Sequence, residues 1–214
     1  MRRYVLLLAL VALSAPVAAQ RPVIGIGFAG GTMGVGVDVA AQLHPKVAVR
    51  GRFAVMPYEP EFDLDDVSYV FQLPSPQMGL FADVTVIPIR LTVGLRYLAN
   101  DLSATATIPS TITIGDETYT SSEVTALNAA LVTRTLSPYI GIGFGRVSGR
   151  GIGLFFDAGV AMHGSPQVEF TATGPVANQP AFITELNREA ATVNDDIEGF
   201  KYYPVIALGL RYGF

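Results

Sequence analysis

Apolar and polar residues alternate along much of this chain. Between Ile152 and Ala172 the even positions are mostly apolar, whereas the odd positions carry small or polar residues such as Asp157. A period of two places alternate side chains on opposite faces of a β-strand. The pattern recurs at the end of the chain, where one face is formed by Ile206, Leu208, Leu210, Tyr212 and Phe214.

Eight segments carry this alternation, and each is predicted to be one strand of a single sheet. They are Val23–Phe28, Met33–Leu43, Val47–Tyr58, Val67–Ile87, Ile89–Ile108, Leu131–Arg146, Gly151–Thr173 and Phe200–Phe214. The short first segment either pairs along its whole length or frays. Eight antiparallel strands in up-and-down order close into a barrel with both chain ends on one side.

The composition favours a membrane setting for this barrel. Half of the 214 residues are hydrophobic and only 15% are charged, whereas about a quarter are charged in an ordinary soluble domain. Beyond the first residues, no stretch offers the ~18 uninterrupted apolar residues of a spanning helix. A closed barrel is the remaining way to satisfy backbone groups in lipid. The predicted fold is therefore an all-β, eight-stranded antiparallel transmembrane β-barrel.

The beginning of the chain predicts a cleaved secretory signal peptide. Arg2 and Arg3 precede a short apolar run, and Pro16-Val17-Ala18-Ala19 resembles a cleavage site. The alternative, an uncleaved membrane anchor, is disfavoured because the run is shorter than the ~20 residues that span a bilayer. We expect a signal peptide over residues 1–19 and one barrel domain over residues 20–214, exported to the outer membrane of a Gram-negative bacterium.

Charge and cysteine content exclude several functions. The net charge is −4 and becomes more negative once Arg2 and Arg3 leave with the signal, so nothing attracts nucleic acid. The absence of Cys excludes disulfides, thiolate metal sites and a lipid anchor on cysteine. We expect a monomer surrounded by outer-membrane lipid, without a cofactor or a metal.

The connections sort by length into two groups. The short ones, His44-Pro45-Lys46, Ile87-Pro88-Ile89 and Val147–Arg150, are expected at the periplasmic side, and the long ones, Glu59–Asp66, Pro109–Ala130 and Gly174–Gly199, at the exterior. The first connection, Ala29–Thr32, would be a very tight external turn. Pro138 and Pro204 lack a ladder donor, which predicts bulges or strand ends near the outer rim.

Two of the long loops carry helix signals. Thr120-Ser121-Ser122-Glu123 fits a capping box, which predicts a helix over Val124–Leu131. Pro180 is followed by an amphipathic pattern over Ala181–Val193, with Phe182 and Leu186 on one side. We expect both helices to fold their apolar sides onto the barrel rim.

Six charged residues share the inward face, namely Asp38, Arg50, Arg52, Asp83, Arg96 and Asp157. The interior of an eight-stranded barrel is just wide enough for side chains to fill, and Arg pairs with carboxylates through two parallel hydrogen bonds. The pattern therefore predicts a lumen plugged by Arg/Asp pairs. The alternative is a charged constriction, which would make the protein a narrow pore or a small-ligand conduit. Arg90 and Arg211 lie nearer the periplasmic rim and are expected to be solvated.

Three weaker motifs favour structural readings. Gly25–Gly30 matches the dinucleotide pattern G-x-G-x-x-G, but a strand follows it where cofactor binding requires a helix. Asp63, Asp65 and Asp66, and later Asn194, Asp195, Asp196 and Glu198, have oxygen ligands suited to Ca²⁺ or Mg²⁺. Neither cluster has the spacing of a dedicated calcium site, so we expect a solvated acidic rim.

His163, Ser165 and Glu169 suggest a catalytic alternative. A His beside a Ser can activate it for acyl transfer, with a carboxylate orienting the ring. His163-Gly164-Ser165 is similar to the His-x-Ser pair of outer-membrane lipid A deacylases, which makes a lipid A-modifying hydrolase a remote alternative. Those enzymes act from the outer face, whereas the alternation turns this pair inward, so we expect no enzyme. His44, beside Pro45, is a turn residue.

Several strings resemble a known family. Tyr119–Val124, Ser137–Gly145, Phe156–Val160, Gly164-Ser165-Pro166 and Tyr203–Tyr212 look like segments of a family of uncharacterised Gram-negative outer-membrane β-barrel proteins. The resemblance covers most of the chain after residue 19, and it implies an outer-membrane location with a structural or surface-interaction role. The motifs are structural and imply no established activity.

The final strand resembles the C-terminal strand of bacterial outer-membrane barrels. Tyr202 at one end and Tyr212 and Phe214 at the other are typical of the two interfacial aromatic girdles. The resemblance implies that the barrel assembly machinery recognises this strand through its lipid face, which carries Leu208, Leu210, Tyr212 and Phe214.

Overall fold

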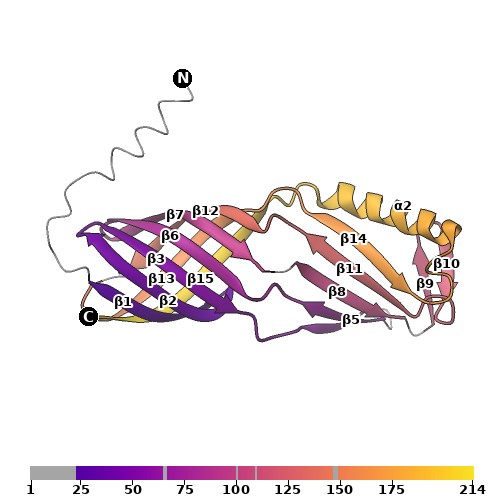
Figure 1. The fold of residues 1–214 in the computed structure, drawn as a ribbon, viewed down its shortest axis with the longest axis horizontal. Helices are drawn as coiled ribbons and strands as arrows, with labels where there is room; N and C mark the ends of the chain where they lie inside the picture. The colour runs from indigo at the N-terminus through magenta and orange to yellow at the C-terminus, as the bar shows by residue number, and fades with distance from the viewer. Residues whose placement is uncertain (1–22, 65–66, 100, 109, 147–148) are drawn as a thin grey trace, which may run out of the picture.

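A closed antiparallel barrel of eight strands forms one half of the molecule (Figure 1). The computed structural model describes residues 23–64, 67–99, 101–108, 110–146 and 149–214, so the predicted signal peptide over residues 1–19 lies outside them. Around the barrel the strands follow in chain order: β1 (Ile24–Gly31), β2 (Gly34–His44), β3 (Val47–Val55), β6 (Gln77–Val86), β7 (Ile89–Leu98), β12 (Leu136–Gly145), β13 (Gly151–Met162) and β15 (Tyr202–Gly213). The predicted fold class is confirmed.

A second sheet continues beyond the end of the barrel that carries the long connections (Figure 1). Its five antiparallel strands are, in spatial order, β4 (Glu61–Leu64), β5 (Val67–Gln72), β8 (Leu102–Thr107), β11 (Ala126–Val132) and β14 (Gln167–Thr173). A hairpin of β9 (Thr111–Ile114) and β10 (Glu117–Thr120) and a helix, α2 (Pro180–Ile197), complete this part of the molecule. We call it the long-loop module and the opposite barrel end the short-turn end.

The long predicted strands are therefore wrong as single elements. Val67–Ile87 divides into β5 and β6, and Ile89–Ile108 into β7 and β8; Leu131–Arg146 and Gly151–Thr173 divide in the same way. The period-two pattern continues across each break, so it does not mark where a barrel strand ends and a module strand begins. The breaks fall at short irregular segments such as Leu73–Pro76 and His163–Pro166, which separate barrel from module.

The first strand is complete rather than frayed. β1 pairs with β2 from Ile24↔Ala41 to Gly31↔Gly34 and with β15 from Gly25↔Gly213 to Gly31↔Ala207. Only Thr32 and Met33 separate β1 from β2, so the tight turn is confirmed, but it begins three residues and ends one residue later than predicted. The barrel therefore closes through β1, which pairs with β2 on one side and with β15 on the other.

Pro138 and Pro204 are accommodated at strand ends. Pro138 pairs with Leu95 of β7 but precedes the first pair with β13, and Pro204 pairs with Val160 of β13 beyond the last pair with β1. Each proline therefore lies where one neighbouring strand has already ended, and the missing donor is not needed there. The register shift in the barrel falls instead between Gln42 and His44.

The capping-box sequence does not start a helix. Its contact forms, because the Thr120 backbone N–H donates to Glu123 Oε2 at 2.9 Å. The chain then makes a turn and continues into β11, which pairs with β8 on one side and β14 on the other. Two flanking strands and the complete burial of Val124 outweigh the local preference for a helix.

The second predicted helix is confirmed as α2, but its apolar side packs onto the long-loop module and not onto the barrel rim as expected. Phe182 and Leu186 are its buried side chains, and they pack into an apolar cluster with Ile108, Ile114 and Val124. Asn194 of α2 covers the sheet edge: its Oδ1 accepts from the Val168 N–H at 2.6 Å, and its Nδ2 donates to the Val168 carbonyl at 3.3 Å. Covering an edge in this way protects it from pairing with another chain.

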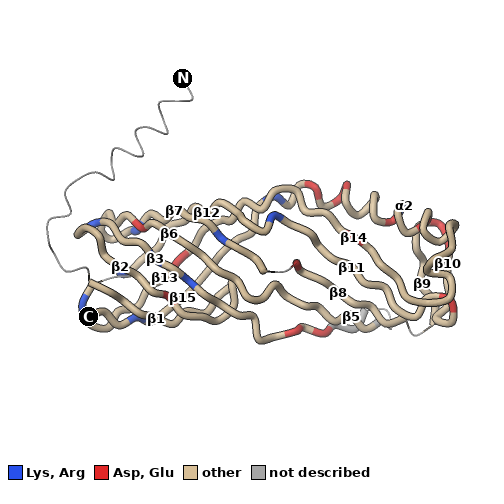
Figure 2. The backbone as a smooth tube through the Cα atoms, viewed as in Figure 1, with Lys and Arg blue, Asp and Glu red and all other residues tan. Residues whose placement is uncertain are grey.

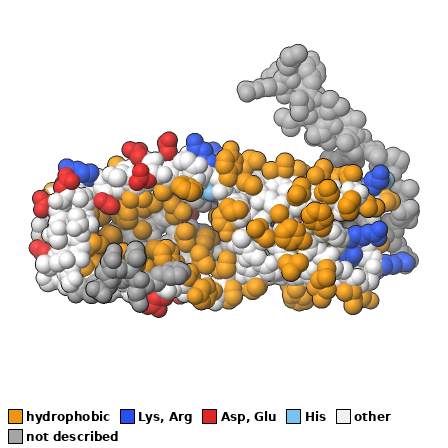
Figure 3. All heavy atoms as spheres, turned by 180° about the vertical axis from the view of Figure 1, so that it is seen from behind, with side chains coloured by type: hydrophobic (Ala, Val, Ile, Leu, Met, Phe, Trp, Pro, Cys, Tyr) orange, Lys and Arg blue, Asp and Glu red, His pale blue; other side chains and the backbone are white. Residues whose placement is uncertain are grey.

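The outer surface of the barrel is an apolar belt (Figure 3). Leu80, Leu154 and Leu208 are 63%, 68% and 61% exposed, and they alternate with buried inward positions along β6, β13 and β15. Such a large continuous apolar surface is unlike that of a soluble monomer. Among the described residues, no helix is both long enough and apolar enough to cross a membrane.

Candidate functional site

Charged side chains from six strands point into the barrel. Each is at most 7% exposed, because it points inward, away from the apolar outer belt. They come from β2 (Asp38), β3 (Arg50, Arg52), β6 (Asp83), β7 (Arg90, Arg96), β13 (Asp157) and β15 (Arg211). Figure 2 shows basic positions along the barrel and acidic positions along α2 and the far end of the long-loop module.

Arg50 contacts the carboxylates of three other strands. Its Nη1 lies 2.7 Å from Asp157 Oδ2 and 3.7 Å from Asp38 Oδ1, and its Nε lies 3.1 Å from Asp83 Oδ2. Its guanidinium also lies 4.9 Å from the ring centroid of Phe81. One side chain therefore ties together strands on different sides of the barrel.

Arg52 and Arg90 complete the network. Arg52 binds Asp38 through two parallel hydrogen bonds of 2.8 Å. Arg90 forms ion pairs with Asp83, at 3.3 Å, and with Asp157, while Thr92 Oγ1 donates to Asp83 at 2.6 Å. Three arginines and three aspartates thus balance one another inside the barrel, which we call the lumen network.

The membership of this network differs from the prediction in two places. The sequence-predicted residues Asp38, Arg50, Arg52, Asp83 and Asp157 lie together, but Arg96 forms no ion pair within the described part of the chain. Arg90, which was expected to be solvated, is 1% exposed and takes the third place. Height above the turn was misleading, because the slant of the strands brings Arg90 diagonally against Asp83 on the paired strand β6. The inward position of Arg90 in the alternation, combined with this diagonal contact, would have identified Arg90 as a member of the network.

Arg211 is also buried rather than solvated. It is 5% exposed, and its guanidinium donates to the carbonyl oxygens of Arg146 and Gly149, the latter at 2.5 Å. Both acceptors belong to the β12–β13 connection at the short-turn end. Arg211 therefore ties this connection to β15.

Aromatic rings occupy the space beside the network, and glycines make room for them. Phe81 and Tyr139 meet edge to face with centroids 5.1 Å apart, and Phe155 is 2% exposed. A Cβ at Gly159 would collide with the Tyr139 hydroxyl, and one at Gly209 with the Phe155 ring. The small inward residues of the alternation therefore have a packing role.

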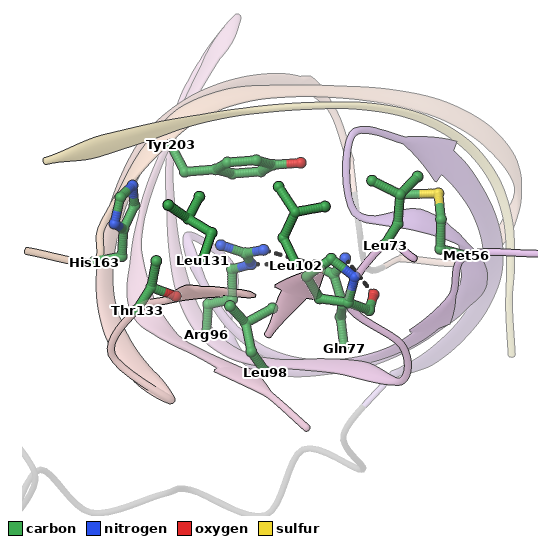
Figure 4. A pocket seen from close by; sticks show the side chains of 11 residues that line it. Met56, Leu73, Gln77, Arg96, Leu98, Leu102, Leu131, Thr133, His163 and Tyr203 are labelled. Atoms are coloured by element: carbon green, nitrogen blue, oxygen red, sulfur yellow. Dashed lines mark hydrogen bonds between the residues drawn. The ribbon is translucent and has the colours of Figure 1, made fainter. Parts of the chain in front are cut away.

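A cavity lies between the network and the long-loop module, where Figure 3 shows the surface hollowed at their junction. We call it the mouth cavity; its volume is about 110 Å³. Arg96, Gln77, Tyr203 and His163 line it together with apolar side chains that include Leu98, Leu102 and Leu131 (Figure 4). Leu102 and Leu131 come from β8 and β11, so the module forms part of its wall.

Arg96 is held in place inside this cavity. Its Nε and Nη2 donate to Gln77 Oε1 at 3.2 and 2.9 Å, and its guanidinium lies 4.4 Å from the ring centroid of Tyr203. Both partners are fixed in turn, because Gln77 Nε2 donates to the Pro74 carbonyl at 3.0 Å and the Tyr203 hydroxyl donates to the Thr32 carbonyl at 2.7 Å. The sequence reasoning missed Gln77 and Tyr203, although both have inward parity.

The candidate catalytic residues are not assembled. His163 is buried, whereas Ser165 and Glu169 are exposed, and no hydrogen bond joins His163 to either of them in the part of the chain that the structure describes. Burial, reinforced by the charge of Arg96, lowers the pKa of His163, so its imidazole is neutral at pH 7. The arrangement has no activated serine.

The structure also places the residues of the other sequence motifs. Within the described ranges, no group of three or more His, Cys, Asp or Glu residues is placed to hold a metal ion; Asp65 and Asp66 lie outside those ranges. Gly25–Gly30 lies within β1, which turns directly into β2. The predicted lipid-face residues Leu208, Leu210 and Tyr212 on β15 and Phe214 directly after it are all more than half exposed.

Comparison with known proteins supports the fold. No protein-family model and no curated protein matches the chain. The crystal structure of Acinetobacter baumannii CarO2 is similar, with a TM-score of 0.60 and 18% sequence identity over 91% of this chain and 100% of that one. Acinetobacter baumannii CarO gives 0.60 and 19% over 91% of this chain and 98% of its own. The chain therefore has the fold of small outer-membrane β-barrel proteins, as the sequence resemblance implied.

Proposed function

We propose that this protein is a non-enzymatic outer-membrane β-barrel with a structural or surface-interaction role, and that its lumen is closed by the lumen network. One observation carries the proposal: Arg50 contacts Asp38, Asp83 and Asp157 from three other strands while being 2% exposed. A side chain paired in several directions cannot move aside for a passing ion without leaving several buried charges unpaired. Breaking even one buried pair costs about 3–5 kcal/mol.

The charge balance supports a closed lumen over the alternative of a narrow pore. Conducting pores bind ions weakly enough to release them and are lined by groups that remain free to replace water. Here the carboxylates of Asp38, Asp83 and Asp157 are already occupied by guanidinium groups, and Phe81, Tyr139 and Phe155 occupy the adjacent space. A water-filled path would need several of these contacts to open together.

The long-loop module favours a surface role. It has its own apolar core around Phe182 and Val124, and a helix covers one edge of its sheet. An ordered module of this kind presents a defined surface, whereas flexible loops do not. Its exposed acidic side chains, such as Asp116 beside Arg188, would face the exterior of a Gram-negative cell, and the monomeric barrel would be surrounded by outer-membrane lipid.

Single-channel recording in planar bilayers tests the closed lumen. We expect purified protein to give no steady, reproducible conductance, because the network stays paired. The matched variant Arg50→Ser/Asp83→Ser removes one positive and one negative side chain, so it keeps the charge balance while opening space. It should conduct above the wild-type background, which verifies that the assay detects a passage of this size. Steady conductance by the wild type would establish the narrow-pore alternative instead.

We also propose that the barrel assembly machinery recognises β15 through its lipid face. Phe214 contributes an exposed ring that meets Tyr212 edge to face at 5.1 Å, and its N–H donates to the Ile24 carbonyl at 2.9 Å. A Phe214→Ser substitution keeps this backbone hydrogen bond and removes the ring. We expect several-fold less protein in the outer-membrane fraction of cells, with unchanged refolding of the purified variant into detergent.

Phe144→Ser is the matched control for this assembly test. Phe144 is an exposed ring at the same end of the barrel, on β12. If recognition depends on β15, the control variant accumulates like the wild type. Equal losses in both variants would mean that only apolar area matters, and a soluble wild-type protein would reject the outer-membrane location.

A further inference from the structure

Arg96 is a buried cation that has no counter-ion among the residues that the structure describes. It is 3% exposed, and no carboxylate of the described residues lies within 4.0 Å of it, although each guanidinium of the lumen network has at least one. Its hydrogen bonds go through Nε and Nη2 to the neutral amide of Gln77. Taking a charge out of water costs several kcal/mol unless it is paired, so this guanidinium is left with capacity to bind an anion.

The surroundings of Arg96 are apolar on the side of the mouth cavity. Leu98 lies on the same barrel strand, and Leu102 and Leu131 close the cavity from the long-loop module (Figure 4). An apolar pocket with a few fixed polar groups is the usual form of a small-molecule site. About 110 Å³ is far more than the ~10–15 Å³ needed for one water, but it is too small for a lipid chain.

Among the described residues, His163 provides a second polar atom without a partner in the same cavity, although its ring is hydrogen-bonded to the backbone of Gly164. It is 8% exposed, and its Nδ1 has no hydrogen-bond partner within the described part of the chain. Buried polar atoms without partners are rare in folded proteins. Because the imidazole is neutral at pH 7, it can complement a polar group without adding a second buried charge.

From these features we propose that the mouth cavity binds a small organic anion, namely a monocarboxylate with a compact apolar body. The carboxylate would accept hydrogen bonds from Arg96, whose position is fixed by Gln77 and Tyr203, and the apolar body would pack against Leu98, Leu102 and Leu131. A cation would be repelled by Arg96, and a neutral hydrocarbon would leave the guanidinium unpaired. A hydrated inorganic anion such as phosphate would not satisfy the apolar walls.

The inference goes beyond the proposed function and does not depend on it. The cavity lies above the lumen network, between the barrel and the long-loop module, so an anion can enter from the exterior whether or not the lumen is closed. The single-channel recording and the ligand titration therefore have independent outcomes.

Benzoate is a suitable probe, because it combines one carboxylate with a compact ring. Methyl-labelled protein in lipid nanodiscs is titrated with benzoate, and the NMR signals of Leu98, Leu102 and Leu131 are followed. We expect saturable shifts at these residues. Three compounds are titrated in parallel as controls: benzamide is neutral, benzylammonium is cationic, and inorganic phosphate has no apolar body. Each should bind more weakly than benzoate by about tenfold or more.

Two variants and one control test the assignment of residues. Arg96→Met keeps the volume and removes the charge, and it should weaken benzoate binding about tenfold or more while the barrel keeps its folded gel mobility. Leu102→Phe should exclude the ring while retaining Arg96. Arg188→Gln on α2 makes the same change in net charge at an exposed position and should bind like the wild type. The proposal is overturned if Arg96→Met binds benzoate as tightly as the wild type, if benzamide binds equally well, or if no shift saturates.

Discussion

Replacing Arg50 with methionine should lower the free energy of unfolding by about 3–5 kcal/mol, the cost of breaking a buried ion pair. The variant leaves Asp38, Asp83 and Asp157 to share the two remaining arginines of the lumen network, so one buried negative charge is uncompensated. Equilibrium urea unfolding of protein folded into phospholipid vesicles, followed by gel mobility, measures the change. A loss of this size is a large fraction of the stability of a small domain.

Two companion variants separate the network from a general effect of losing an arginine. Arg188→Met removes an arginine that pairs with Asp116 and Glu185 on the exposed surface of the long-loop module, and exposed pairs contribute about 0–1 kcal/mol. Arg50→Met/Asp83→Asn restores the charge balance and should recover part of the loss. If Arg50→Met unfolds within 1 kcal/mol of the wild type, comparable to the ~0–1 kcal/mol of a surface pair, the network does not hold the barrel together.

Leu208→Arg should destabilise the barrel by about 2–4 kcal/mol, because it places a charge on the lipid face near mid-bilayer. Leu208 lies in the middle of β15, opposite Phe156 on β13 and Gly30 on β1, and is 61% exposed. The outward position offers no protein partner for the new guanidinium. The same urea unfolding in vesicles measures the effect.

Ile152→Arg is the matched control for lipid depth. Ile152 has the same outward parity and is 76% exposed, but it lies at the short-turn end opposite Tyr212. A charge at the interface costs about 0–1 kcal/mol. Equal effects at both positions, or a harmless Leu208→Arg, would contradict the assignment of this face to lipid.

The two faces of each barrel strand were predictable because they depend on side-chain periodicity alone. The outward positions of β15 and the inward positions of Asp38, Arg50 and Asp157 follow from the alternation, since a strand allows only two orientations. Barrel closure and strand number follow from the number of alternating segments, because the chain has no apolar run long enough for a membrane-spanning helix. The α2 helix was predictable for a similar reason, because its apolar residues recur with a different period.

The long-loop module could not be predicted in the same way. Its strands have the same period as those of the barrel, so the alternation runs through Leu73–Pro76 and His163–Pro166 without marking where one sheet ends. The residues after Thr120 show that a local helix signal can also predict the wrong element. Their capping contact forms locally, but the pairing of β11 with β8 and β14 decides that the segment is a strand.

The sequence by itself determined which residues face lipid and which face inwards, because that division needs only the positions along each strand. Only the tertiary structure decided which inward charges meet. Arg90 joins the carboxylates and Arg96 does not, since strand register and slant set the distance between side chains far apart in the chain. The same geometry leaves Arg96 beside Tyr203, facing a cavity whose wall comes from a second sheet. Long-range pairing sets these contacts, and a periodic pattern does not encode it.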